Sequence, residues 1–160
     1  MPDDSLLTRL RVADVMTTDV VAVAPDTSLD TVARQLSANR ISGVPVVDAS
    51  GRAVGVVSVT DLVDPKRKAS QTRGFPVFYR IEDGWATPEV DDAVIKAGRA
   101  EDVMTPMPFT IESDATLLQA AEAMVEHRVH RLLVTEDGAL KGLISTIDVL
   151  RGLTEGTREG

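Results

Sequence analysis

The chain has 160 residues and 43% of them are apolar, which is enough to build a packed hydrophobic core. Its 17 basic and 25 acidic residues give a formal net charge of −8, which disfavours nucleic acid and anionic membranes as partners. The chain contains no cysteine, so disulfides, zinc–thiolate sites and cysteine nucleophiles are excluded.

The sequence repeats itself, and the repeat organises the predicted elements. The segment Ala13–Thr17 (ADVMT) recurs as Glu101–Thr105 (EDVMT), 88 residues later. Beyond the turns DASG and EDG the offset falls to 87, which indicates a one-residue deletion in a loop. Two copies in one register predict a pseudo-symmetric pair rather than a longer array. We place the first repeat at residues 12–63, an insertion at 64–99 and the second repeat at 100–153.

The first repeat is predicted to run β-α-β-β-α. A short strand at Asp19–Ala24 precedes a helix that Ser28 opens as its N-cap, and the apolar residues of this helix recur at spacings of three and four. A buried strand at Val44–Val47 leads through the turn DASG into a strand at Ala53–Val57, so that the two form a hairpin. The last helix begins near Ser58.

The insertion between the repeats is rich in aromatic residues, and it holds Phe75, Phe78, Tyr79 and Trp85. Such a composition predicts an ordered segment, with a strand at Val77–Ile81 and a short helix near Pro88–Ala97. The favoured interpretation is a lid packed over the core. The alternative is a dimer or partner surface, because exposed aromatic residues anchor interfaces.

The second repeat follows the order of the first. A strand is predicted at Met107–Ile111, Thr116 opens a helix, and strands at Leu132–Val134 and Leu140–Ile144 flank the turn EDG before a last helix near Ser145. Half a sheet with helices on one face leaves apolar surface uncovered, so we expect the two repeats to pair around a pseudo-twofold axis. The predicted fold class is α+β.

One motif, Gly-x-x-Ser-x-x-Asp, occurs as a first motif at Gly55–Asp61 and as a second motif at Gly142–Asp148. Each copy runs from a buried strand into a helix, where free backbone N–H groups favour an anion. The carboxylate three residues after the serine is a good acceptor for two vicinal hydroxyl groups, as on a ribose. The alternative is structural, because Ser-x-x-Asp is also close to a capping box, in which both side chains satisfy helix amides.

The combination of ADVMT, SGVPVVD and GVVSVTDLV, repeated as EDVMT, HRLLVTEDG and GLISTIDVL, resembles the CBS (cystathionine-β-synthase) domain pair. The resemblance covers roughly residues 12–63 and 100–153. In this family the serine of the motif contacts a phosphate and the aspartate holds the ribose hydroxyls. The resemblance assigns these roles to Ser58, Asp61, Ser145 and Asp148. It also implies a flat, disk-like homodimer.

The resemblance further implies that a ligand's base lies against the chain before the middle strand, and that the segment after Asp-Val-Met-Thr lines the same cleft. The residues concerned are Thr18, Asp19, Val20, Ser42, Gly43, Val44, Pro45, Pro106, Met107, Val129, His130, Arg131 and Leu132. His130 and Arg131 could pair with a phosphate, so we expect the second cleft to prefer a phosphorylated ligand. For Arg131, a solvated charge beside the strand is an equal alternative. The first cleft has no local cation, and we expect it to take an adenosine-like group or to stay empty.

The favoured function is a regulatory, non-catalytic module that binds an adenine nucleotide or adenosyl ligand, such as AMP, ADP, ATP or S-adenosylmethionine, and modulates an unknown effector protein. The alternative is a dimeric interaction or scaffold protein with vestigial clefts. An enzyme, for example a nucleotide hydrolase, ranks below both, because the sequence contains no recognisable catalytic set.

We expect neither a cofactor nor a metal site. The two histidines of the chain, His127 and His130, have no second cluster of ligands beside them in the sequence. No segment approaches the roughly 18 apolar residues that span a bilayer, and the N-terminal sequence lacks the pattern of a signal peptide. We therefore expect a soluble, cytoplasmic protein with no membrane partner.

Overall fold

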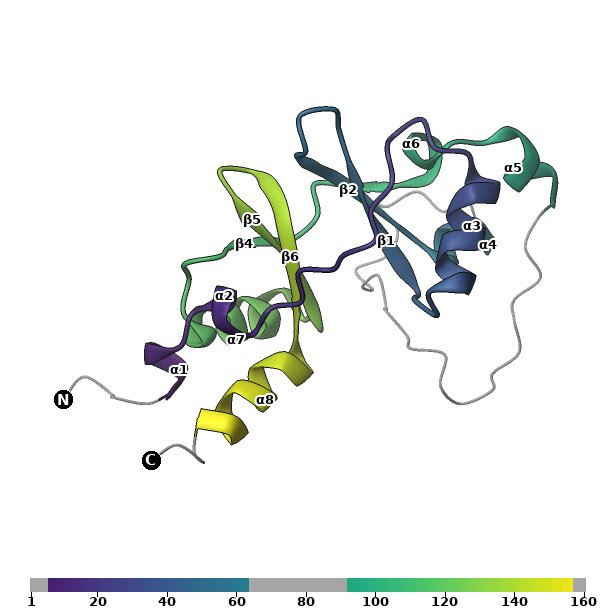
Figure 1. Cartoon of the computed structure of the whole chain (residues 1–160). Coiled ribbons are helices and arrows are strands. Elements are labelled where there is room, and N and C mark those ends of the chain that lie inside the picture. The colour runs from purple at the N-terminus through teal and green to yellow at the C-terminus, as the bar shows by residue number, and fades with distance from the viewer. Residues whose placement is uncertain (1–5, 64–91, 157–160) are drawn as a thin grey trace. The chain divides into compact units, whose positions relative to one another are not determined.

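The structure of the chain, a computed structural model, describes residues 6–63 and 92–156 (Figure 1). The described residues divide into two compact units. Unit 1 contains residues 6–20 and 109–156, and unit 2 contains residues 21–63 and 92–108. Each unit combines helices with one three-stranded sheet, which confirms the predicted α+β class.

Unit 2 is built on an antiparallel sheet. β1 (Gly43–Val47) pairs with β2 (Ala53–Ser58), and β2 pairs with the short β3 (Thr105–Pro106). Val23 adds a single parallel bridge to Val46 of β1. The helices are α3 (Leu29–Ala38), α4 (Val59–Val63), α5 (Asp92–Ala97) and α6 (Ala100–Val103).

Unit 1 has the same topology. β5 (Arg131–Glu136) and β6 (Ala139–Ser145) form its antiparallel hairpin, and β4 (Thr110–Glu112) pairs with β5 in parallel. Thr17 makes an isolated antiparallel bridge to Leu143 of β6, which corresponds to the pairing of β3 with β2. The helices are α1 (Leu6–Arg9), α2 (Val12–Val15), α7 (Leu117–His127) and α8 (Thr146–Gly156).

The predicted helix starts are confirmed, and they explain where the core lies. Ser28 accepts a hydrogen bond from the Thr31 N–H at the start of α3, and Thr116 accepts one from the Gln119 N–H at the start of α7. The apolar face of each helix is then buried in its own unit. In unit 2 the core consists of Val23, Leu29, Val32, Leu36, Val44, Val46, Val57, Leu62 and Ala100.

The Asp-Val-Met-Thr segment of each repeat packs in the unit that holds the motif of the other repeat. In unit 1 a Cβ atom placed on Gly142 would lie 2.7 Å from the Thr17 carbonyl oxygen and 2.8 Å from Met16 Sδ. In unit 2 a Cβ atom on Gly55 would lie 2.6 Å from Met104 Sδ. The glycine of each motif is therefore the residue over which a segment of the other repeat docks, and no larger side chain fits there.

Two predicted strands differ from the structure. The segment Asp19–Ala24 is not a strand, and only Val23 pairs, through hydrogen bonds with Pro45 O and Val47 N–H. The strand predicted at Met107–Ile111 begins later, at Thr110. The prolines on both sides of Met107 have no N–H to donate, and Met107 has a φ of 51°, which a strand does not accommodate.

The insertion is only partly described. The helix predicted near Pro88–Ala97 is present as α5, which begins at Asp92. The strand predicted at Val77–Ile81 and the aromatic residues of the insertion lie outside the described residues.

We predict that Gly142→Ala destabilises the protein more than Gly55→Ala does. The closest obstacle at Gly142 is the Thr17 backbone carbonyl, which cannot move without the chain, whereas the closest atom at Gly55 belongs to the flexible Met104 side chain. Overpacking of this kind costs about 1–3 kcal/mol. The midpoints of thermal unfolding of the two variants test the order, and equal midpoints for Gly142→Ala and the wild type would contradict the docking.

Candidate functional site

The first motif forms a closed polar contact at the junction of β2 and α4. Both the backbone N–H and the hydroxyl of Ser58 donate to Asp61 Oδ2, at 2.7 and 2.8 Å. Ser58 is buried and Asp61 is half-buried. The carboxylate therefore satisfies the N-cap amide, which is one half of a capping box.

The second motif makes the same contact at the junction of β6 and α8, and completes the capping box. The Ser145 N–H and hydroxyl donate to Asp148 Oδ2 at 2.8 and 2.7 Å, and the Asp148 N–H donates back to Ser145 Oγ at 3.3 Å. Asp148 is buried, as expected for a carboxylate that accepts several hydrogen bonds. The capping interpretation of the motif is thus realised fully in the second copy and by half in the first. Each copy keeps a carboxylate next to a hydroxyl, half-buried at Asp61 and buried at Asp148.

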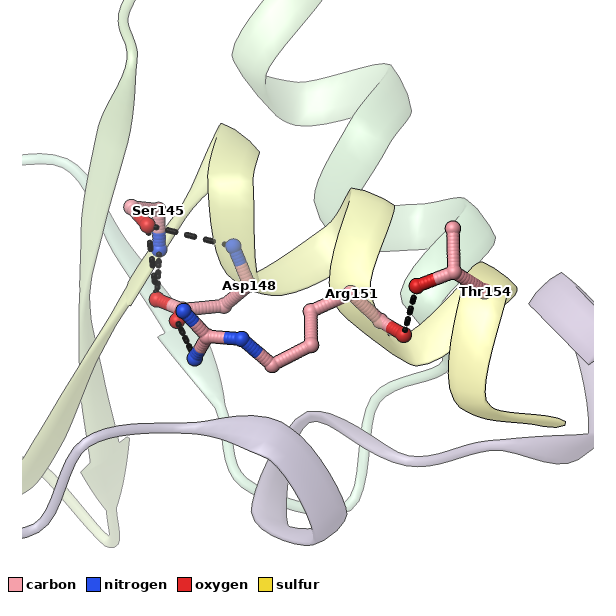
Figure 2. A network of polar contacts seen from close by, with 4 residues as sticks. All are labelled: Ser145, Asp148, Arg151 and Thr154. Atoms are coloured by element: carbon pink, nitrogen blue, oxygen red, sulfur yellow. Dashed lines mark hydrogen bonds and ion pairs between the residues drawn. The ribbon is translucent and has the colours of Figure 1, made fainter.

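An arginine distinguishes the second motif. Arg151 lies one helical turn after Asp148 on α8, and Figure 2 shows its side chain folding back toward the carboxylate. The guanidinium Nη1 lies 3.3 Å from Asp148 Oδ1 and forms an ion pair with it. Asp148 therefore uses Oδ2 for the cap and Oδ1 for the cation. Sequence analysis did not single out Arg151, although its i, i+3 spacing from Asp148 was a usable signal.

In each unit, the residue just before the first hairpin strand (β1 or β5) is hydrogen-bonded to the helix that follows the motif. The carbonyl of Ser42 accepts the N–H of Val59, the first residue of α4, at 2.9 Å. The carbonyl of His130 accepts the N–H of Thr146, the first residue of α8, at 3.0 Å. In the hairpins, Gly43 lies opposite Ser58 and Arg131 lies opposite Ser145. The segments predicted to contact a base therefore begin beside the serines predicted to contact a phosphate.

Each unit contains one motif, the chain before its middle strand, and one of the two segments that follow Asp-Val-Met-Thr. In each unit that segment comes from the other repeat than the motif does. Unit 2 holds Ser42, Gly43, Val44, Pro45, Ser58, Asp61, Pro106 and Met107. Unit 1 holds Thr18, Asp19, Val20, Val129, His130, Arg131, Leu132, Ser145 and Asp148. The segment after the first Asp-Val-Met-Thr thus accompanies the second motif, because Thr17 bridges to Leu143 on the strand of that motif.

The predicted residues offer different atoms to a ligand. Four of the predicted residues have buried apolar side chains, so they could contact a ligand only through their backbone groups: Val44, Pro45, Val129 and Leu132. Thr18, Asp19, Pro106, Met107 and His130 are exposed, and Arg131 is half-buried at the start of β5. Ser42 is buried, and its Oγ has no hydrogen-bond partner.

Two further findings concern the described part of the chain. Within residues 6–63 and 92–156, no group of three or more histidine, aspartate or glutamate side chains is placed to hold a metal ion. In the same residues, no helix combines the length and the apolar character that crossing a bilayer requires.

Two plant proteins are similar to this chain over most of its length. The chloroplastic CBS domain-containing protein CBSX1 of Arabidopsis thaliana is 31% identical over 148 residues, which cover 89% of this chain and 62% of that protein. The chloroplastic CBSX2 of the same plant is 32% identical over 158 residues, which cover 92% of this chain and 65% of that protein. The chain therefore spans less than two thirds of the length of these relatives.

Solved structures and the family pattern agree with this similarity. The crystal structure of CBSX2 in complex with AMP superposes with a TM-score of 0.67 and 27% identity, and covers 92% of this chain and 98% of that one. The crystal structure of the CBS-pair protein CBSX2 from Arabidopsis thaliana gives a TM-score of 0.71 over 94% of this chain and 98% of that one, at 27% identity. The sequence pattern of the CBS domain matches residues 12–65 and 100–155. With both repeats matched and the fold shared, the chain belongs to the CBS domain family.

Proposed function

We propose that the chain is a non-catalytic regulatory module that binds an adenine nucleotide or an adenosyl ligand at its two motifs and passes this occupancy to a separate effector protein. The observation that carries the proposal is the serine hydroxyl held against an aspartate carboxylate at a strand-to-helix junction, present twice. The AMP complex of the related CBSX2 supports adenine nucleotides as the ligand class. The net charge of −8 argues against nucleic acid and membrane partners, and the proposed location is the cytoplasm.

Binding at the first motif requires only a change of hydrogen-bond partner. The Ser58 hydroxyl would turn from Asp61 Oδ2 to a phosphate oxygen, while the Ser58 N–H keeps the carboxylate in place. Asp61 would then accept from the two ribose hydroxyls, since a carboxylate has about four acceptor positions. The cap and the ligand contact are compatible, because the Ser58 N–H makes the cap and the Ser58 hydroxyl would make the ligand contact.

Binding at the second motif has an additional electrostatic component. The guanidinium of Arg151 occupies Asp148 Oδ1, and its side chain is more than half exposed. A phosphate near Ser145 would share this cation, and Arg131 and His130 lie at the adjacent strand end. The second motif would therefore favour ligands with a phosphate over neutral nucleosides.

The packing of one repeat's Asp-Val-Met-Thr segment beside the other repeat's motif suggests how a bound ligand would act on a partner protein. In unit 1 the Thr17 bridge places residues of the first repeat on the strand that ends at Ser145. A ligand held by Ser145 and by the segment after Thr17 would brace the two repeats against each other. Such a ligand shifts a conformational equilibrium only through its different affinity for the two arrangements.

We predict that Asp61→Asn and Asp148→Asn each weaken AMP binding at their own motif by tenfold or more, because the amide loses the charge and one acceptor of the carboxylate. The measurement is isothermal titration calorimetry, with Asp30→Asn as the control. Asp30 is a half-exposed helix carboxylate, paired with Arg34, outside both motifs. Wild-type AMP affinity in both motif variants would refute the proposal.

The free energy of unfolding distinguishes the capping role of Asp148 from its proposed role in ligand binding. Asp148→Ala is expected to lower the free energy of unfolding by about 0.5–2 kcal/mol, because the Ser145 amide loses its acceptor. Asp148→Asn keeps an acceptor oxygen and should lose less. Denaturant unfolding checks this order, and an Asp148→Ala variant as stable as the wild type would contradict the capping role.

We also propose that the chain forms a homodimer through α7 and α8. These helices pack against each other in unit 1 and expose Val125 (77%), Ile147 (59%) and Leu150 (56%). Isolated exposed apolar residues are ordinary, but three on two packed helices are typical of an interface. At the equivalent positions the first repeat has Ser37, Thr60 and Val63, so two of the three apolar side chains are specific to the second repeat. A second copy meeting the same face would bury it isologously.

We predict that Val125→Lys converts a dimer into a monomer, because a charge would then face its own copy across the interface. Sedimentation velocity or light scattering measures the mass. The matched control is Ser37→Lys, at the equivalent exposed helix position of the first repeat, and it should leave the mass unchanged. An unaltered dimer in Val125→Lys would exclude this face.

A further inference from the structure

Each motif has a methionine sulfur packed on its glycine. In unit 2 a Cβ atom built on Gly55 would lie 2.6 Å from Met104 Sδ and 3.0 Å from Met104 Cγ. In unit 1 a Cβ atom built on Gly142 would lie 2.8 Å from Met16 Sδ and 3.3 Å from Met16 Cγ. The two thioethers therefore occupy the space that a side chain on the glycine would need, and one more heavy atom at this contact would collide.

The residue after each methionine is paired with the strand that carries the motif. Thr17 and Leu143 of β6 exchange two backbone hydrogen bonds of 2.9 Å. Thr105 of β3 lies opposite Val56 of β2 in the antiparallel sheet. The side chain of Met104 also packs against the hydrophobic core of unit 2. The methionines thus lie at the contacts through which a segment of one repeat docks beside the motif of the other.

The chemistry of sulfur makes these contacts sensitive to oxidation. The chain has no cysteine, so its sulfur atoms are the thioethers of methionine. Hydrogen peroxide oxidises a thioether to a sulfoxide. The O–O bond breaks, one oxygen atom bonds to the sulfur, which loses two electrons, and water leaves. The product is polar and one heavy atom larger, and burying a polar oxygen among apolar neighbours opposes docking.

The described methionines differ in how easily a peroxide reaches them. Met107 is 88% exposed, Met16 and Met104 are half-buried, and Met124 is buried at 4% exposure. A peroxide in solution should therefore react first with Met107, then with Met16 and Met104, and last with Met124. This order provides two internal references, one on each side of the docking methionines.

We propose that Met16 and Met104 form a redox switch, in which oxidation of their sulfur atoms releases the docked segments from Gly142 and Gly55. A methionine sulfoxide reductase reverses the step, because two thiols are oxidised to a disulfide while the sulfoxide returns to a thioether and water leaves. The switch acts on the packing beside each motif, so it does not depend on which ligand the motif binds.

The test oxidises the full chain stepwise with hydrogen peroxide, and peptide mass spectrometry measures the sulfoxide at each methionine. Oxidation of Met107 should leave the midpoint of thermal unfolding unchanged, because its side chain is exposed. Oxidation of Met16 and Met104 should then lower the midpoint by about 5 °C or more. Treatment with a methionine sulfoxide reductase and a dithiol should restore it.

Leucine variants identify the sulfur atoms responsible. A chain with Met16→Leu and Met104→Leu keeps similar side-chain volumes but takes up no oxygen at these positions, so its midpoint should survive the same treatment. Met107→Leu is the matched control and should lose stability as the wild type does. An unchanged midpoint with both sulfoxides formed, an equal fall in the double variant, or oxidation of Met124 ahead of Met16 and Met104 would overturn the proposal. If the double variant does not fold, the wild type and Met107→Leu still decide.

Discussion

The close approach of a Met-Thr segment to the glycine of each motif is the contact on which the rest of the structure depends. Gly142 has the Thr17 carbonyl and Met16 Sδ where a Cβ atom would be, and Gly55 has Met104 Sδ. Through this contact the start of one repeat becomes part of the unit that holds the other motif. Neither repeat can form its unit alone, because Val12 and Ala100, which precede the two docking segments, are fully buried in those units. Each unit therefore requires residues of both repeats.

The same junction is a helix cap and the proposed binding site, which explains why the motif admitted two interpretations. The serine and aspartate close the start of α4 and α8 as caps. In this motif the cap brings a carboxylate, a hydroxyl and a helix N-terminus to one point, and these groups also suit a phosphorylated ribose. A structure with a satisfied capping box therefore does not argue against a ligand site. The capping role and the proposed binding role can be separated by replacing the aspartate with asparagine, which keeps an oxygen for the cap and removes the charge.

Local features of the fold could be predicted from the sequence, whereas features that depend on distant contacts could not. Ser28 and Thr116 were predicted as N-caps, and the hairpin strands were predicted from their turns, because capping and turn formation depend on neighbouring residues. The strand predicted at Asp19–Ala24 fails because its apolar residues pair at a single point with β1. The packing of each Asp-Val-Met-Thr segment beside the other repeat's motif and the unpartnered hydroxyl of Ser42 depend on residues far apart in the chain or on three-dimensional burial, for which one sequence carries no pattern.

The duplication also allows the two motifs to diverge without loss of the fold. At the motifs, both copies share a backbone hydrogen bond from the first helical residue to the chain before the middle strand, and a glycine over which a methionine packs. The positions around them are free to differ. Arg151 pairs with Asp148 in the second copy, while the equivalent residue of the first copy is Asp64, of opposite charge and outside the described residues. His130 is exposed where Ser42 is buried. The two motifs thus share one backbone frame and differ in the charge and burial of the side chains around it.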